Sequence, residues 1–189
     1  MTSHLTFTLN DGSHIPWLAF GTGTALYGQD AADQVCLAIA NGITHLDGAQ
    51  SYRNEESLGA GIKASGKSRS ELYIVTKLKA LENNQTVKQS LEESLKKLGV
   101  DYVDLFLIHS PIAHIRDGKS RLKEVWRGME EVKRDGLATS IGVSNFTVEH
   151  LTEICDGASV LPAVNQVCLP SSISALIPGF NLWRFLNPD

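Results

Sequence analysis

The stretch LYIVTKLKALENNQTVKQSLEESLKKLGVDYVDLFLIH, at residues 72–109, decides the fold. Its two ends, Leu72–Thr76 and Val103–Ile108, are short apolar runs rich in branched residues, which predict strands buried on both faces. Between them, Thr86 opens a capping box, and apolar residues then recur at helical spacing until Gly99. A strand, a helix and a second strand in this order predict a right-handed unit with two parallel strands.

The same alternation continues along the rest of the chain. Further strands are predicted at Ile43–Leu46, Ser140–Val143 and Ala163–Asn165. Apolar stripes at helical spacing predict helices at Leu122–Val132 and Val148–Cys155. The sequence therefore predicts an α/β protein with about six βα units.

The N-terminal part predicts a small hairpin and helps to choose between two architectures. Thr6–Leu9 alternates in polarity, a turn signal follows at Asn10–Gly12, and apolar residues resume at Ile15. The βα order that follows fits either an open doubly wound sheet or a (β/α)₈ barrel. A doubly wound dinucleotide fold is expected to carry G-x-G-x-x-G after its first strand. Because Gly21–Leu26 lacks the third glycine, we interpret this segment as a glycine turn.

Polar residues follow the predicted strands at intervals of 22 to 35 residues. Singly, each has an ordinary explanation: a helix cap for an aspartate, a solvated side chain for a lysine, a structural role for a histidine. In a barrel, however, the carboxyl ends of all strands lie on one rim, where active sites are found. We therefore expect the strand-end residues to converge. They are Asp47, Lys77, His109, Ser144, Asn145 and Gln166.

Tyr52 lies in the same loop as Asp47 and completes a set suited to acid catalysis. A phenol is a weak acid, and a nearby ammonium group makes it a better proton donor because it stabilises the phenolate. Lys77 could act in this way if Asp47 fixes its position, and His109 could orient a carbonyl oxygen or share the proton. The set fits carbonyl reduction in which Tyr52 supplies the proton and a cofactor supplies the hydride.

Several segments of the chain resemble the signature stretches of the aldo-keto reductase superfamily. These are LDGAQSYRNE at 46–55, VTKL at 75–78, LIHSP at 107–111, IGVSNF at 141–146 and NQV at 165–167. They occur in the family's order, and the resemblance runs from the opening hairpin to about Val167. The resemblance implies a (β/α)₈ barrel that binds NADPH, less often NADH, and reduces aldehydes or ketones.

The resemblance also implies roles for individual residues. The catalytic tetrad would be Asp47, Tyr52, Lys77 and His109. Ser144, Asn145 and Gln166 would hold the nicotinamide carboxamide, and Asp47 would be a further cofactor-binding residue. Many members have tryptophan at the position of Ser110, so we expect a more open or more polar substrate pocket here.

The chain departs from the family pattern after Val167. Residues 168–189 are interrupted by Pro170 and Pro178 and contain neither a helical stripe nor a further parallel strand. We therefore expect an incomplete barrel over residues 1–167 and an irregular tail, and we favour a frame break, a retained intron or an early stop as its origin. An open barrel would expose strand edges and apolar surface. The alternative to a reductase is therefore an inactive truncated fragment, or a module of the same fold that binds a partner.

Composition excludes several other classes of protein. The 189 residues carry 17 Lys and Arg against 21 Asp and Glu, a net charge of −4, which gives no basic field for nucleic acid. No run of about 18 apolar residues predicts a membrane span. The first residues lack the features of a secretory signal, so we expect a cytoplasmic protein. The three cysteines form no C-x-x-C pair, so we expect neither a disulfide scaffold nor a metal site. The expected partner is a small carbonyl substrate, and no pattern indicates an oligomeric state.

Overall fold

The computed structural model of the chain describes residues 5–82, 84–167 and 183–185. Within these residues, six parallel strands lie side by side in the order β10-β9-β6-β5-β4-β3. They are β3 (Ala19–Gly21), β4 (His45–Asp47), β5 (Tyr73–Leu78), β6 (Val103–Ile108), β9 (Ala138–Ser144) and β10 (Val164–Gln166). The parallel sheet and its helices form an incomplete (β/α)₈-type barrel, as the sequence predicts.

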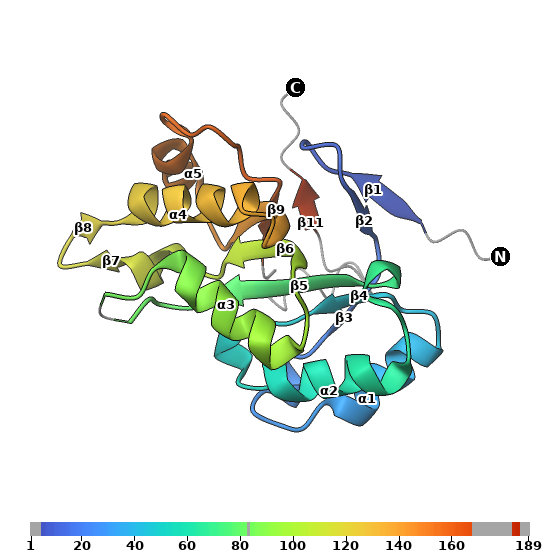
Figure 1. Cartoon of the computed structure of the whole chain (residues 1–189). Coiled ribbons are helices and arrows are strands. Elements are labelled where there is room, and N and C mark those ends of the chain that lie inside the picture. Colours follow the sequence, from blue (N-terminus) through green and yellow to red (C-terminus); the bar gives the residue numbers. More distant parts are fainter. Residues whose placement is uncertain (1–4, 83, 168–182, 186–189) are drawn as a thin grey trace, which may run out of the picture.

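Helices wrap the outer side of this sheet (Figure 1). They are α1 (Ala32–Ala40), α2 (Glu55–Ser65), α3 (Val87–Leu98), α4 (Leu122–Arg134) and α5 (Val148–Cys155). The predicted capping box of α3 is present, because Thr86 Oγ1 accepts from the backbone N–H of Gln89. Gly99 ends the helix in the left-handed conformation, with φ 68°.

Alternation along the strands divides the core into two layers. Ile74, Leu78 and Phe106 belong to the large cluster between the sheet and the helices. The intervening residues Val75 and Leu107 belong to a separate, inner cluster. With a period of two, the residues that continue the inner layer at the rim are Lys77 on β5 and His109 just after β6.

The N-terminal hairpin, β1 (Thr6–Thr8) and β2 (His14–Pro16), closes the opposite end of the inner layer. Leu9 and Ile15 are buried in the inner cluster. Asp11, in the turn, accepts hydrogen bonds from Ser13 and from Ser140 on β9. The hairpin thus covers the floor of the barrel, at the end opposite the polar strand ends.

Two features were not anticipated from the sequence. The loop after β6 contains a short hairpin, β7 (Ile115–Arg116) and β8 (Lys119–Ser120). In the tail, which we expected to be irregular, Trp183–Phe185 form β11, which pairs antiparallel with β10. The free edge of β10 offers unpaired backbone groups that such a segment can satisfy. The other residues of the tail, including Cys168, lie outside the described residues.

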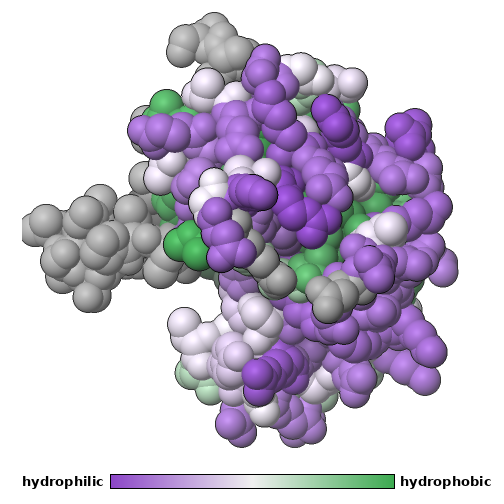
Figure 2. Space-filling view, turned by 90° about the vertical axis from the view of Figure 1, so that its left-hand side faces the viewer, coloured by the Kyte–Doolittle hydropathy of each residue, from purple (hydrophilic) through white to green (hydrophobic). Residues whose placement is uncertain are grey.

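The surface of the described residues is mainly polar. Figure 2 shows one side of the molecule on which hydrophilic residues predominate and hydrophobic residues occupy limited areas. In the part of the chain that the structure describes, no helix is both long and apolar enough to cross a membrane.

Candidate active site

The buried ammonium group of Lys77 is the centre of the candidate site. Its side chain is 1% exposed, and its Nζ contacts a carboxylate oxygen of Asp47, the carbonyl oxygen of Gly48 at 2.9 Å and the hydroxyl oxygen of Tyr52 at 3.3 Å. An ammonium group has three N–H donors, and these three acceptors match them. A buried charge is tolerated only when it is paired and hydrogen-bonded in this way.

Asp47 connects the first part of the sheet with the last parallel strand. One carboxylate oxygen contacts Lys77, and the other accepts a hydrogen bond from Gln166 Nε2 at 2.9 Å. Asp47 ends β4 and Gln166 ends β10, so the curvature of the sheet brings together residues that are 119 positions apart. The predicted tetrad and the predicted nicotinamide residues therefore share one hydrogen-bond network.

Tyr52 is held by the short 3₁₀ helix Gln50–Tyr52 and by close packing of its ring. The ring is 5.4 Å from the His109 ring, edge to face, and its centroid is 4.9 Å from Lys77 Nζ. On the other side it meets Gly23, where a Cβ atom would lie 2.9 Å from Tyr52 Cζ. The turn after β3 thus requires glycine because the catalytic candidate occupies the space of a side chain.

His109 is half-buried, and its surroundings keep the imidazole neutral near pH 7. Burial and the nearby Lys77 ammonium lower its pKa to about 4, although the Asp47 carboxylate acts in the opposite direction. Ser51 Oγ lies 2.9 Å from His109 Nδ1. A neutral histidine beside a phenol can donate a hydrogen bond to the oxygen of a carbonyl compound only in the tautomer whose N–H points towards that oxygen.

Ser144, Asn145 and Gln166 form a compact group on the same rim. Ser144 Oγ donates to the carbonyl oxygen of Gln166 at 2.8 Å, and Asn145 Nδ2 lies 3.0 Å from Ser144 Oγ and 3.1 Å from the carbonyl oxygen of His109. Asn145 adopts the left-handed conformation, φ 62°, which asparagine tolerates better than most residues. The residues chosen from the strand ends are therefore neighbours in space.

The amide group of Gln166 supports a site for a carboxamide. Its Nε2 is used by Asp47, but its Oε1 is buried and has no hydrogen-bond partner within the described residues. A buried acceptor without a donor is costly unless a ligand or water supplies one. The N–H groups of a nicotinamide carboxamide are donors of this kind, so the residues fit that group.

The sequence reasoning missed several polar residues that fix the loop carrying Tyr52. Gln50 donates to Ser90 on α3 at 3.0 Å and accepts from the backbone N–H of Lys79 at 2.9 Å. The buried Glu55 accepts from Thr76 at 2.7 Å and from Ser94 at 3.2 Å. Their sequence signal is weak, because polar residues in a loop or on a helix are normally solvated.

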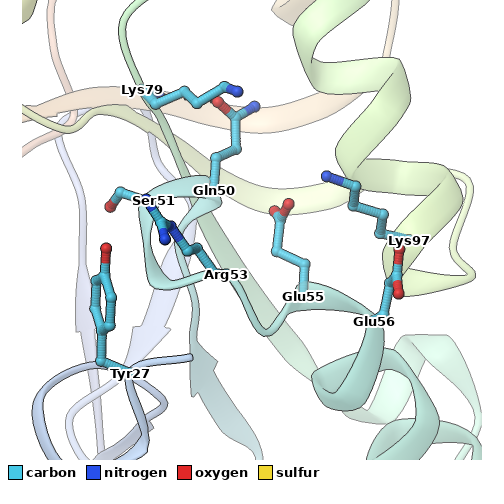
Figure 3. Close-up of a pocket in the computed structure, with 8 residues that line it drawn as sticks. All are labelled: Tyr27, Gln50, Ser51, Arg53, Glu55, Glu56, Lys79 and Lys97. Atoms are coloured by element: carbon cyan, nitrogen blue, oxygen red, sulfur yellow. Dashed lines mark hydrogen bonds between the residues drawn. The ribbon is translucent and has the colours of Figure 1, made fainter. Parts of the chain in front are cut away.

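A polar pocket of about 500 Å³ adjoins this loop (Figure 3). Its walls come from the loop with Ser51, the start of α2, the end of β5 and the end of α3, and five of its eight lining residues are charged. The lining residues are Tyr27, Gln50, Ser51, Arg53, Glu55, Glu56, Lys79 and Lys97. Ser51 links the pocket to His109. Among the described residues, no group of three or more His, Cys, Asp or Glu side chains could hold a metal ion.

Comparison with known proteins identifies the family of the chain. The model of the Aldo/keto reductase family matches residues 17–170. Over 163 residues the chain is 41% identical to a glyoxal reductase of Bacillus subtilis. This alignment covers 86% of the chain and 57% of the reductase. Over 163 residues it is 39% identical to an NAD/NADP-dependent indole-3-acetaldehyde reductase of Schizosaccharomyces pombe, with 82% and 56% covered.

Solved structures give the same result. The crystal structure of a Bombyx mori aldo-keto reductase in complex with NADP matches with a TM-score of 0.76 and 37% identity, covering 89% of this chain and 59% of that one. The chain thus spans about half the length of the curated relatives that it matches.

Proposed function

Because the chain belongs to the aldo/keto reductase family, we propose that it reduces an aldehyde or a ketone to the alcohol, with Tyr52 as the proton donor. The cofactor is NADPH, with NADH as the alternative, and when bound it supplies the hydride. The observation that carries this proposal is the contact of the Lys77 ammonium with both Asp47 and the Tyr52 hydroxyl.

Lys77 prepares Tyr52 for proton transfer. Its ammonium lies 3.3 Å from the phenolic oxygen and stabilises negative charge that develops there as the proton leaves. Asp47 keeps Lys77 in place and balances its charge in a buried environment. Since Lys77 is the donor in this contact, the Tyr52 hydroxyl hydrogen is free to bond the oxygen of a carbonyl compound.

Ser144, Asn145 and Gln166 are proposed to hold the nicotinamide carboxamide, with Asp47 as a further cofactor-binding residue. The unsatisfied Oε1 of Gln166 supports this assignment, because it offers an acceptor for an amide N–H at the rim where Lys77 and Tyr52 lie. The match to a Bombyx mori structure solved with NADP supports the same type of cofactor.

The substrate is proposed to be a small carbonyl compound. The polar pocket beside Ser51 is lined by none of Tyr52, Lys77 and His109, so its lining does not define the chemistry of the substrate. Relatives named for glyoxal and for indole-3-acetaldehyde support aldehydes as the class.

The test is NADPH oxidation by the purified 189-residue chain with a reactive aromatic aldehyde and with glyoxal. Tyr52→Phe is expected to lower kcat by about 10²-fold or more, as loss of a general acid does, while NADPH binding, followed by fluorescence, stays within a few fold. Tyr102→Phe is the matched control, because that ring packs under Arg69. Undiminished turnover in Tyr52→Phe, or a folded chain that neither binds NADPH nor turns over, contradicts the proposal.

A second candidate function is a non-catalytic module that binds a partner. It is supported by β3, which lies at the edge of the described sheet, and by the neighbouring Trp17 and Leu18, which are 49% and 50% exposed. Light scattering on the purified chain separates the two: a stable compact monomer that turns over substrate favours the reductase, and a self-associated chain without NADPH binding favours the module.

A further inference from the structure

The hydroxyl group of Ser51, the residue before Tyr52, lies 2.9 Å from Nδ1 of the His109 ring. We propose that the Ser51 hydroxyl donates a hydrogen bond to His109 Nδ1 and so positions this ring with its proton on Nε2, directed to the carbonyl oxygen of the substrate. Ser51 is thus a positioning residue that acts through His109. The proposal deepens the proposed function and rests on it for the role of the ring.

The place of the Ser51 hydroxyl is set by the loop rather than by the histidine. Gln50 ties the loop to α3 through Ser90 and to β5 through the backbone N–H of Lys79. Tyr52, on the other side of Ser51, packs its ring against Gly23. The half-buried Ser51 is therefore held between two anchored neighbours, with its Oγ 2.9 Å from His109 Nδ1.

The backbone of His109 is also fixed by hydrogen bonds. Its backbone N–H donates to the carbonyl oxygen of Leu78 at 3.1 Å, and its backbone carbonyl oxygen accepts from Asn145 Nδ2 at 3.1 Å. The ring then lies edge to face with Tyr52. Nδ1 is taken by Ser51, and Nε2 has no hydrogen-bond partner within the described residues.

Counting donors and acceptors decides the direction of the bond. A neutral imidazole has one N–H and one lone pair, and a hydroxyl can donate or accept. Ser51 Oγ has no other partner among the described residues, so donation to Nδ1 satisfies both the hydroxyl hydrogen and the ring lone pair. The reverse arrangement would direct a lone pair from Nε2 at the carbonyl oxygen, which repels it. Only the first arrangement presents an N–H to the substrate.

The charged groups around the ring are consistent with a neutral imidazole. Lys77 on β5 and Asp47 on β4 act on it with opposite signs, and Tyr52 faces it from the 3₁₀ helix. Burial and Lys77 outweigh Asp47, and the pKa of His109 falls to about 4. At neutral pH the tautomer, rather than the charge, therefore determines what His109 offers to a substrate.

The test measures the histidine directly. In the full chain with ¹⁵N-labelled histidine, NMR identifies which ring nitrogen carries the proton, and His109→Asn identifies the signal by its loss. We expect the proton on Nε2. A proton on Nδ1 in the unmodified chain overturns the proposal, whatever the variants do.

The variants Ser51→Thr and Ser51→Val form a matched pair, because they have the same shape and differ in the hydroxyl. A donor to Nδ1 stabilises the unprotonated ring, so Ser51→Val is expected to raise the His109 pKa by roughly half to one pH unit relative to Ser51→Thr. An unchanged or lower pKa in Ser51→Val contradicts donation by Ser51. Ser51→Ala serves as the hydroxyl-free variant if Ser51→Val does not fold, which circular dichroism reports.

These measurements need no turnover, so the two proposals fail separately. An Nε2-protonated ring in a chain without reductase activity contradicts the proposed function alone. Activity together with an Nδ1-protonated ring contradicts the role of Ser51 alone. In an active chain, Ser51→Val is expected to lower kcat about tenfold with little change in NADPH affinity, and Ser51→Thr is expected to retain activity.

Discussion

Gln166 Nε2 donates a hydrogen bond to Asp47 Oδ2 at 2.9 Å, and this bond joins the end of β10 to the end of β4. Asp47 also contacts the Lys77 ammonium. The other side-chain atom of Gln166, Oε1, has no hydrogen-bond partner within the described residues and is the acceptor proposed for the carboxamide. The side chain of Gln166 thus binds Asp47 through its N–H donor, and its acceptor oxygen is left for the proposed ligand. Under the proposed function, the network couples cofactor binding to the residue that fixes Lys77.

Gln166→Glu tests this coupling. The substitution keeps the shape of the side chain, removes the donor to Asp47 and places a second carboxyl group beside that carboxylate. We expect NADPH affinity to fall by roughly tenfold to a hundredfold, the cost of a lost hydrogen bond and an unfavourable like charge. The measurement is a fluorescence titration with NADPH, with Gln34→Glu, at an exposed position of α1, as control. Equal affinities in the two variants would contradict a coupling of the Gln166–Asp47 hydrogen bond to cofactor binding.

Lys77 and Asp47 are expected to depend on each other for stability. Lys77→Met leaves the Asp47 carboxylate buried without its cation, which costs about 3–5 kcal/mol of the free energy of unfolding. The double variant Asp47→Asn/Lys77→Met removes both charges and is expected to be more stable than Lys77→Met alone. Urea denaturation of the unmodified chain, of Asp47→Asn, of Lys77→Met and of the double variant completes the cycle. Additive losses in the double variant would contradict a coupled pair.

The lowered pKa of His109 predicts a loss of stability in acid. The folded chain holds the ring neutral down to about pH 4, whereas an unfolded histidine takes up a proton below its ordinary value of 6.5. Between these values the unfolded state binds more protons, so stability falls as pH falls from 6.5 towards 4. Since the ring is only half-buried, solvent screening limits the effect to on the order of 1 kcal/mol.

Urea denaturation at pH 7.5 and pH 4.5 checks this effect. The unmodified chain is expected to lose more stability than His109→Asn between the two pH values. His45, whose pKa is lowered by burial despite its bond to Pro16, contributes in the same direction, and His45→Asn measures its share separately. Identical losses in the unmodified chain and in His109→Asn would rule out a neutral His109.

The sequence was sufficient to predict those parts of the fold that follow from periodicity. The strand Val103–Ile108 and the helix capped at Thr86 and ended at Gly99 were predicted with the bounds that the structure has, because a continuous apolar run determines the strand and the caps determine the helix. The strand β11 could not be predicted from the pattern of its own segment. It forms because the free edge of β10 offers a partner, which is a property of the sheet.

The site was predictable where residues end strands and unpredictable where they only support other residues. Asp47, Lys77 and Gln166 were found because a polar residue at the end of a buried strand is unexpected, and the structure places them in one network. Ser51 and Glu55 were missed, because a serine or glutamate near a helix start is common. Their functions depend on which side chain lies opposite, and that follows from the loop geometry.

Asp11 is expected to hold the hairpin against the barrel. It accepts from Ser140 Oγ at 2.8 Å and from Lys133 Nζ at 3.2 Å. Burial would raise its pKa, but the hydrogen bonds from Ser13 and Ser140 and the bond from Lys133 lower it overall. Asp11→Asn is therefore expected to cost about 1–2 kcal/mol of the free energy of unfolding near pH 7. The difference between the unmodified chain and the variant is expected to shrink at a pH below the pKa of Asp11, where the carboxyl group is protonated. Urea denaturation checks it against the exposed Asp101→Asn, which is expected to be neutral.

Gly23 is expected to be required for the position of Tyr52 rather than for folding. A Cβ atom at Gly23 would lie 2.9 Å from Tyr52 Cζ, so Gly23→Ala must displace the ring, whereas nothing lies within 4 Å of a Cβ atom at Gly21. In Gly23→Ala the phenol moves from Lys77 Nζ, and kcat is expected to fall about tenfold or more, since small misplacements of a reacting group are costly. Gly21→Ala should leave kcat within a factor of two and the free energy of unfolding within about 0.5 kcal/mol. NMR signals of the Tyr52 and His109 rings report the displacement without turnover. Unchanged ring signals in Gly23→Ala would show that the turn after β3 does not set the geometry of the phenol.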